Sequence, residues 1–346
     1  MNQHIESVKD YYSKTLKTNQ DLKTTACCSA ESIPGYLKKL VSEIHPDVRA
    51  KFYGCGVPVP FALEDKTILD LGSGSGRDCF LFSKLVGENG RVIGIDMTPE
   101  QISVALEHTD YHIEKFGYKK SNITFKEGYM EDLASLDIAD NSIDVVVSNC
   151  VFNLSPDKER LYREVFRVLK PGGELYFSDV FTNRRLSAKA QSNPVLLGEC
   201  LGGAMYTEDF RRLMAKLGCN DYRQMGAVKI EITNDEVQSQ CEGAEFYSIT
   251  VRAFKMELED RCEDYGQVAY YKGGIPFSEN GFILDDHHIF EKDKPMLVCS
   301  NTANMLSQSR FAPYFRIEGG LSKHYGLFDC SDNNTASTAA TPGACC

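Results

Sequence analysis

A glycine-rich segment, "LDLGSGSGRD" (69–78), follows a short apolar run and precedes a predicted helix. Gly72, Gly74 and Gly76 allow a tight turn in which the backbone approaches a ligand without obstruction by side chains. Their G-x-G-x-G spacing differs from the G-x-G-x-x-G of dinucleotide sites, which favours a nucleoside-like ligand over a pyrophosphate. Asp70 precedes the loop, where its carboxylate can meet a cationic ligand.

Acidic and apolar side chains follow the next two predicted strands. Asp96 ends "RVIGID", twenty residues after Gly76, and an acid at this place can accept hydrogen bonds from both ribose hydroxyls. Met97 comes next, with an apolar side chain suited to the face of an adenine. Met130 and Glu131, in "GYMEDL", end the third strand and are expected near the adenine edge.

Two cysteines follow the fourth and fifth predicted strands. "SNCVFNL" puts Cys150 at the carboxyl end of the fourth strand beside the neutral Asn149, and Cys200 lies in the glycine-rich "LLGECLGGAMY". An oxygen or nitrogen acceptor carries a proton and usually needs a base, but no histidine or carboxylate adjoins Cys150. The two thiols indicate instead a soft, thiophilic acceptor. The alternative is that both are small buried apolar residues, as free cysteines often are.

Further cysteines lie near the two ends of the chain. Cys55 in "FYGCGVPVP" and the pair Cys27 and Cys28 in "TTACCSA" fall in polar or glycine-bounded segments, where a thiol is accessible. Cys345 and Cys346 end a segment rich in Ser, Thr and Ala, and they either capture a metalloid or have no role.

Charge and composition limit the classes of partner. With 38 basic and 49 acidic residues the net charge is −11, which argues against binding to the phosphates of nucleic acid. No segment approaches the roughly 20 apolar residues of a membrane helix, and the amino-terminal "MNQHIESVKDYYSKTLK" lacks the apolar core of a signal peptide. We therefore expect a cytoplasmic monomer. Its thirteen cysteines then need an explanation other than a disulfide scaffold.

Short apolar segments alternate with helical patterns between residues 62 and 225. Strands are expected at 67–71, 91–96, 123–128, 143–149 and 174–180. Because these segments are almost continuously apolar, they are typical of parallel strands covered on both faces. The alternation predicts a doubly wound α/β sheet.

We divide the chain into four parts. Residues 1–61 are a helical amino-terminal lead-in, and 62–225 form the domain with the glycine loop. Residues 226–325, with strand-like segments such as "FYSITVRAFKM", form a smaller β-rich domain. Residues 326–346 are a cysteine-containing tail whose low apolar content predicts disorder.

The combination of Asp70, the three glycines, Asp96 and "LKPGGELYFSD" resembles class I S-adenosylmethionine-dependent methyltransferases over roughly residues 60–225. This resemblance implies a Rossmann-like fold with a sulfonium methyl donor held across the carboxyl ends of the strands. The expected donor-binding residues are Asp70, Gly72, Gly74, Gly76, Asp96, Met97, Met130, Glu131 and Asn149.

Six motifs narrow the resemblance: "YGCG", "LGSGSGRDC", "GIDMT", "SNCVFNL", "GGELYFSDV" and "GECLGGA". Together they are similar to the arsenite S-adenosylmethionine methyltransferases from about residue 20 to about residue 320. The similarity implies that Cys150 and Cys200 bind trivalent arsenic, with Cys55 as a candidate third ligand. It also implies that Cys27 and Cys55 are the other two catalytic thiols. Cys28, beside Cys27, departs from the family pattern.

The resemblance implies a detoxification reaction without a base. Thiolate-bound arsenic keeps a lone pair that attacks the sulfonium methyl, so the protein mainly positions the reactants and excludes water. The substrates are arsenite or its glutathione conjugates, and no permanently bound metal is expected. Each transfer oxidises arsenic, and a new round needs two electrons, which a cysteine pair supplies by closing a disulfide. We expect Cys27 and Cys55 to do so with one of the two rim thiols, and glutathione or thioredoxin to reopen the disulfide.

Two other interpretations stay open. A methyltransferase for a carbon or oxygen acceptor, such as a quinone or a sterol, would have a similar donor site, and it predicts that Cys150→Ser stays active. A cysteine-rich protein that only sequesters metal ions is the second, but it does not explain a donor site. Zinc binding is disfavoured because no CxxC motif with a partner CxxC or HxxxH is present.

Overall fold

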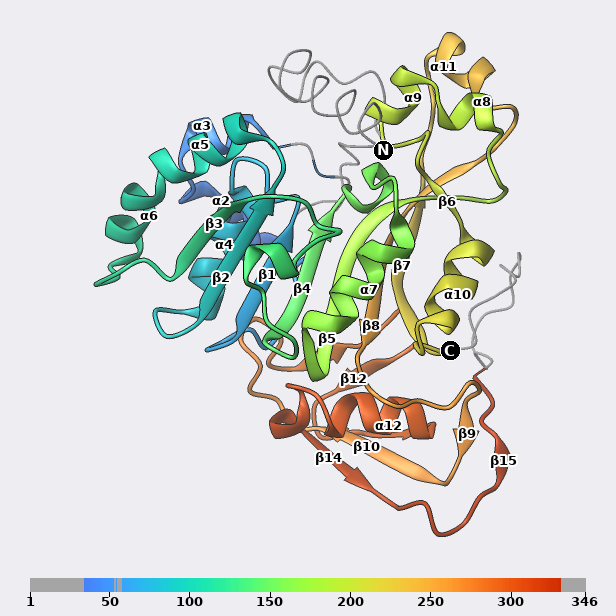
Figure 1. Ribbon diagram of the computed structural model, residues 1–346. Coiled ribbons are helices and arrows are strands. Elements are labelled where there is room, and N and C mark those ends of the chain that lie inside the picture. Colours follow the sequence, from blue (N-terminus) through green and yellow to red (C-terminus); the bar gives the residue numbers. More distant parts are fainter. Residues whose placement is uncertain (1–33, 53, 55–57, 331–346) are drawn as a thin grey trace.

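The computed structural model describes residues 34–52, 54 and 58–330 (Figure 1). The predictions for Cys27, Cys28, Cys55 and the residues after 330 therefore lie outside the described residues. Among the described residues, none of the helices has both the length and the apolar character needed to cross a bilayer.

The centre of the molecule is an eight-stranded sheet in the order β3-β2-β1-β4-β5-β8-β7, with β6 paired to β5. Its strands are β1 (Thr67–Leu71), β2 (Arg91–Asp96), β3 (Ile123–Glu127), β4 (Ile143–Asn149), β5 (Leu169–Thr182), β6 (Met205–Tyr206), β7 (Tyr222–Lys229) and β8 (Phe246–Phe254). The strands from β3 to β5 are parallel, whereas β8 runs antiparallel to both β5 and β7. This arrangement confirms the predicted doubly wound α/β fold.

Helices cover both faces of the sheet. They are α2 (Gly35–Ser42), α3 (Pro46–Ala50), α4 (Arg77–Val86), α5 (Pro99–Glu107), α6 (Thr109–Phe116), α7 (Lys158–Val168), α8 (Ala188–Gln191), α9 (Pro194–Gly198), α10 (Thr207–Lys216), α11 (Asp235–Gln240) and α12 (Ser300–Ser307). Short 3-10 turns are η4 (Ala134–Leu136), η5 (Phe152–Leu154) and η6 (Ala312–Tyr314). In β1, Leu69 packs in one core with Val165 of α7, while Ile68 packs in the opposite core with Phe80 of α4. Because alternate residues enter two cores, the strands need apolar side chains at nearly every position.

The carboxy-terminal part packs below the main sheet in Figure 1 around a core of its own. Its strands are β9 (Glu263–Asp264), β10 (Gln267–Tyr271), β11 (Gly281–Ile283), β12 (Ile289–Glu291), β13 (Pro295–Val298), β14 (Phe315–Glu318) and β15 (Gly326–Leu327). They form a three-stranded sheet, β13-β10-β14, and two small pairs. Cys262 and Cys330 are disulfide-bonded, and the buried Cys299 packs beside them. This disulfide differs from the prediction that the thiols of the chain are reduced.

Two boundaries of the predicted division differ from the structure. Residues 226–256 were assigned to the β-rich domain, but β8 pairs along β5 from Thr182↔Phe246 to Glu174↔Phe254 and completes the main sheet together with β7. The alternating pattern of these segments predicts that they are strands, but it does not indicate which strands they pair with. Gly326 and Leu327, which the prediction placed in the disordered tail, form a strand that pairs with β9.

Buried charges join the carboxy-terminal part to the main sheet. Arg223 of β7 lies completely buried and donates from Nε to Asp221 Oδ1 at 2.6 Å and from Nη1 to Asp285 Oδ2 at 2.9 Å. Arg252 of β8 donates to Glu174 of β5 and to the carbonyl oxygen of Leu284. Removing one partner would leave a buried charge unpaired, so these contacts fix how the two parts meet.

Candidate functional site: a donor cleft beside two buried thiols

A cleft of about 1070 Å³, its open mouth included, lies at the carboxyl ends of β1, β2 and β4. The strand order reverses between β1 and β4, and open α/β sheets bind ligands at such a point. The predicted donor residues that line it are Asp70, Gly72, Gly74, Asp96, Met97, Met130, Glu131 and Asn149. Gly76 does not line it; it precedes α4 with φ 88°, and a Cβ there would lie 2.8 Å from the Phe125 ring.

The glycine loop is held in place by Asp96. Its Oδ2 accepts the N–H of Gly74 at 2.9 Å, and its Oδ1 accepts the N–H of Thr98 at 2.8 Å. Gly72 has φ 75°, and a Cβ there would lie 2.4 Å from Cγ1 of Val151. The loop therefore needs glycine at this position, for its backbone conformation and for its close approach to the segment that carries Cys150.

Asp70 is buried at the end of β1, and its pKa is strongly raised. Burial is the main cause, and the neighbouring Asp78 adds to it, so that the pKa reaches about 8. The thiol of Cys79 donates to Asp70 Oδ2 at 3.2 Å and opposes the rise. At neutral pH Asp70 is therefore mostly protonated, and a cation bound beside it would favour its carboxylate.

The amino-terminal lead-in forms part of the cleft wall, and nothing in the sequence had singled out the residues that line it. Lys51, Phe52 and Gly54 line the cleft, and the Phe52 ring lies 3.2 Å from the guanidinium carbon of Arg77. Arg77 Nε in turn donates to Asp78 Oδ1 at 2.7 Å. The sequence "GRD" at the end of the glycine loop contains both Arg77 and Asp78. That the Phe52 ring packs on Arg77 is visible only in the folded structure.

Asn149 and Gln101 add polar groups to the cleft. Asn149 Nδ2 donates to Asp78 Oδ2 at 3.2 Å, so this side chain is held by α4. Gln101 Oε1 is buried and lines the cleft, and it has no hydrogen-bond partner among the described residues. Because buried acceptors are normally satisfied, this oxygen fits a ligand that donates a hydrogen bond inside the cleft.

Cys150 and Cys200 come together at the wall of this cleft. Cys150 lines it directly, with its N–H donating to the carbonyl oxygen of Ser178 at 2.8 Å. Cys200 is completely buried on the turn after α9, and its Sγ donates to the carbonyl oxygen of Cys150 at 3.3 Å. The two cysteines, fifty residues apart in the chain, are thus direct neighbours.

Both cysteines have a left-handed backbone, with φ 63° at Cys150 and φ 60° at Cys200. This conformation costs a residue with a side chain about 1–3 kcal/mol, and such residues cluster at functional sites. A glycine would relieve the cost but would remove the thiol. The strain at both positions is therefore consistent with a requirement for sulfur.

A chain of contacts from β5 positions the turn that carries Cys200. Asp179 accepts from Nδ2 of Asn153 at 2.7 Å and from its backbone N–H at 3.0 Å. The carbonyl oxygen of Asn153 packs so closely on Gly203 that an added Cβ would lie 2.0 Å from it. Burial, and then the neighbouring Cys200, raises the pKa of Asp179 to about 8. Asp179 was not predicted, although "GGELYFSDV" contains it.

The thiols lie in an apolar cluster. Cys150 and Cys200 pack with Leu196, Val237 and other apolar side chains, and Met97 of the cleft packs against the same cluster. Cys241, whose role the sequence left undecided, belongs to this cluster too, and its Sγ donates to the carbonyl oxygen of Val237 at 3.2 Å. The packing around the two thiols is therefore largely apolar, which suits a soft acceptor more than a charged one.

A doubly wound sheet with a glycine loop after β1 and an acid after β2, around a cleft at the strand-order reversal, defines a class I S-adenosylmethionine-dependent methyltransferase. Two family models agree with this class. The first, a methyltransferase domain, matches residues 63–218, and the second, the arsenite methyltransferase C-terminal domain, matches residues 264–344.

Individual relatives cover nearly the whole chain. An arsenite methyltransferase of Aquipseudomonas alcaligenes is 51% identical over 348 residues, which cover 99% of each chain. One of Mus musculus is 44% identical over 314 residues, or 90% of this chain and 82% of the relative. The crystal structure of an arsenic(III) S-adenosylmethionine methyltransferase from Chlamydomonas reinhardtii matches with a TM-score of 0.83 and 50% identity, covering 86% of this chain and 100% of the other. The chain belongs to the arsenite methyltransferase family.

A quinone methyltransferase is a much more partial match. The ubiquinone/menaquinone C-methyltransferase of Klebsiella pneumoniae is 34% identical over 110 residues, which are 32% of this chain and 41% of the relative. The likeness is too short to include both the donor domain and the carboxy-terminal part.

Proposed function

We propose that this chain transfers a methyl group from S-adenosylmethionine to trivalent arsenic held by Cys150 and Cys200. The observation that carries the proposal is the position of Cys200 Sγ, 3.3 Å from the carbonyl oxygen of Cys150, at the wall of the donor cleft. Trivalent arsenic is soft and prefers thiolate ligands, and the apolar cluster around both sulfurs keeps water from it. The substrates are arsenite, its glutathione conjugates and the methylated arsenite that a first round produces.

In this reaction S-adenosylmethionine supplies an electrophilic methyl group. The carboxylates of Asp96 and Glu131 line the cleft and suit a cationic ligand, and Asp70 adds a further negative charge once the bound cation has ionised it. Cys150 and Cys200 hold arsenic with its lone pair toward the cleft, so the As–C bond forms as the S–CH₃ bond breaks. No proton leaves the acceptor, and the site needs no base. Asp179, saturated by donors from Asn153 and Val180, positions the Cys200 turn rather than accepting a substrate proton.

The direct test is to incubate the purified full chain with S-adenosylmethionine, glutathione and arsenite. The products are then separated by oxidation state and number of methyl groups. Methylated arsenic is expected only when donor, thiol and enzyme are all present. Intact arsenite after many equivalents of donor, with bound donor confirmed by calorimetry, would contradict the proposal.

We further propose that Cys27 and Cys55 supply the two electrons that return the oxidised arsenic to the trivalent state. One disulfide, formed between two of the three thiols of Cys27, Cys55 and a rim cysteine, would release these two electrons, and glutathione or thioredoxin would reopen it. Support comes from the sequence alone, because both cysteines lie outside the described residues. We also propose, from the sequence alone, a cytoplasmic monomer that holds no permanently bound metal ion and binds no nucleic acid. The net charge of −11 supports only the absence of a nucleic-acid partner.

Replacing Cys55 by serine is expected to stop the reaction after the first methyl group when glutathione is the only reductant. The reason is that the oxidised arsenic product would no longer be reduced within the protein. The measurement is the ratio of monomethylated to dimethylated arsenic over time. Dimethylated product at full yield from Cys55→Ser would show that this cysteine has no part in the reduction.

Binding of S-adenosylmethionine should release a proton. Asp70 has a pKa of about 8 and is mostly protonated at pH 7 when no ligand is bound. A sulfonium cation beside it favours the ionised carboxylate. A pKa one unit above the pH corresponds to release of about 0.9 proton if the bound cation ionises Asp70 fully. The donor affinity should therefore increase with pH up to about 8 and level off above it.

Calorimetric titrations at pH 7 in two buffers of different ionisation enthalpy measure this release. The same titrations on Asp70→Asn provide the control, because this variant cannot lose the proton. Equal binding enthalpies in both buffers for the wild-type chain would show that Asp70 is already ionised without ligand.

A further inference from the structure

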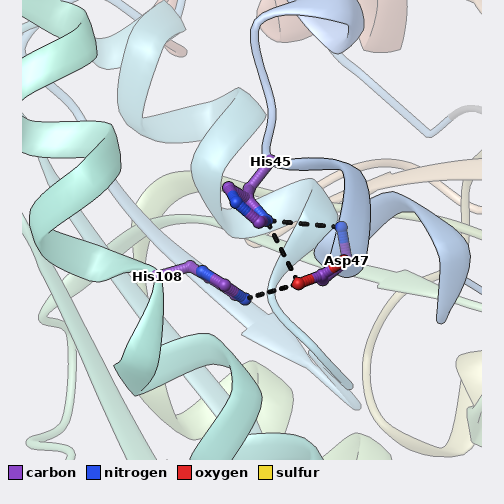
Figure 2. Close-up of side chains that lie close together, drawn as sticks. All are labelled: His45, Asp47 and His108. Atoms are coloured by element: carbon purple, nitrogen blue, oxygen red, sulfur yellow. Dashed lines mark hydrogen bonds and ion pairs between the residues drawn. The ribbon is translucent and has the colours of Figure 1, made fainter.

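Two histidines and an aspartate converge outside the donor cleft (Figure 2). His45 immediately precedes α3, Asp47 lies in its first turn, and His108 stands between α5 and α6. Asp47 Oδ2 is 3.7 Å from His45 Nδ1 and 3.7 Å from His108 Nε2, and the three donor atoms all lie within 4.8 Å of one another. Figure 2 shows both rings directing one nitrogen toward the same carboxylate oxygen.

The spacing of these atoms suits a shared ion better than direct pairing. A separation of 3.7 Å is too long for a hydrogen bond between an imidazole nitrogen and a carboxylate. Two ligand atoms that each lie about 2.0–2.1 Å from a tetrahedral zinc ion are about 3.4 Å apart. Each of the two separations between Asp47 Oδ2 and a histidine nitrogen is a few tenths of an ångström longer than this. To close the site around an ion, the 70% exposed Asp47 side chain must move inward, and the two imidazole rings, now stacked with their centroids 3.9 Å apart, must turn so that their nitrogens converge. His45 Nδ1 must also give up the Asp47 N–H from which it accepts at 3.3 Å.

A third histidine fixes the backbone at both histidine ligands. The backbone N–H of His45 donates to His112 Nε2 at 3.2 Å, and His112 Nδ1 lies 2.7 Å from the carbonyl oxygen of His108. Both bonds can form at once only if Nδ1 carries the proton and Nε2 does not. The lead-in and the α5–α6 corner are thus held in register before any ion arrives.

This corner is connected to the donor cleft through α3. Ser75 of the glycine loop donates from Oγ to the carbonyl oxygen of Val48 in α3 at 3.0 Å. The next residues of the lead-in, Lys51 and Phe52, line the cleft itself. Anything that ties α3 to the α5–α6 corner therefore also stabilises one wall of the donor site.

We propose that His45, Asp47 and His108 bind one exchangeable divalent transition-metal cation of the zinc class, with water in the remaining position. Two imidazoles and one carboxylate are a donor set that such cations take in proteins. The bound cation ties the lead-in to the donor domain and so strengthens binding of S-adenosylmethionine. Formation of the site itself is independent of the proposed arsenic chemistry.

The test uses the full chain and Co²⁺ as a spectroscopic substitute for zinc. Thiolate-bound Co²⁺ shows sulfur-to-metal charge-transfer absorption, whereas nitrogen- and oxygen-bound Co²⁺ does not, so the thirteen cysteines do not obscure the site. We expect one Co²⁺ without charge-transfer bands in the wild-type chain. Loss of a group that supports a metal site typically weakens binding by 10–100-fold, so Asp47→Asn and His108→Ala should bind this ion at least about tenfold more weakly.

The matched control is His287→Ala, which removes a partly exposed histidine that lies 3.5 Å from Asp286 and does not belong to the group of His45, Asp47 and His108. It should bind Co²⁺ as the wild-type chain does. Because Asp47 is exposed, Asp47→Asn keeps the test valid even if His108→Ala fails to fold. Absence of a nitrogen- and oxygen-bound Co²⁺ in the wild-type chain, or equal affinity in Asp47→Asn, overturns the site.

The tether has a separate readout that does not depend on turnover. The dissociation constant of S-adenosylmethionine is measured by calorimetry with and without one equivalent of Co²⁺. A decrease of at least threefold is expected in the wild-type and His287→Ala chains, and none in Asp47→Asn. A donor affinity that Co²⁺ leaves unchanged in the wild-type chain overturns the tether.

Discussion

Replacing Cys150 or Cys200 by serine should reduce arsenite methylation at least about 100-fold, because even a misplacement of about 1 Å in a reacting group can cost this much. A serine hydroxyl is a hard ligand that does not replace a thiolate on trivalent arsenic. Donor binding should change little, above all in Cys200→Ser, because Cys200 does not line the donor cleft. The measurements are kcat/KM for arsenite and the dissociation constant of S-adenosylmethionine for each variant.

Cys219→Ser provides the matched control. Cys219 is also buried and donates to the carbonyl oxygen of Asp221 at 3.6 Å, but it packs in a different core from the two rim thiols. The same chemical change there should leave arsenite methylation within about threefold of the wild-type rate, as for most substitutions away from a reacting group. Full arsenite methylation by Cys150→Ser would show that this thiol does not hold arsenic during methyl transfer.

The donor half of the site could be predicted because its information is local. A parallel strand buried on both faces reads as one apolar run, and β1, β2 and β4 begin and end where the sequence predicted. The glycine loop and Asp96 follow these strands directly. Since strand ends meet at one edge of the sheet, finding the strands already placed most of the donor residues beside one cleft.

The acceptor half depends on contacts that no local pattern contains. That Cys200 reaches the carbonyl oxygen of Cys150 follows from the turn after α9, which returns to the sheet between β5 and β6. Asp179 supports this turn through Asn153, and neither stood out in the sequence. The pairing of β8 with β5 was hidden for the same reason, since alternation predicts a strand but not its neighbour.

Gly203→Ala should separate the two halves of the site experimentally. An alanine Cβ would lie 2.0 Å from the carbonyl oxygen of Asn153, and because this neighbour is backbone, the turn that carries Cys200 must move instead. We expect a loss of at least about 100-fold in kcat/KM for arsenite, the usual cost of a displaced reacting group.

Overpacking should also lower the free energy of unfolding by about 1–3 kcal/mol, which thermal unfolding would measure. The dissociation constant of S-adenosylmethionine should change much less than kcat/KM, because Gly203 does not line the donor cleft. Gly320→Ala, with no atom within 4 Å of the added carbon, is the control for the substitution itself and should leave activity unaffected. Wild-type activity in Gly203→Ala would mean that the position of Cys200 does not limit methyl transfer.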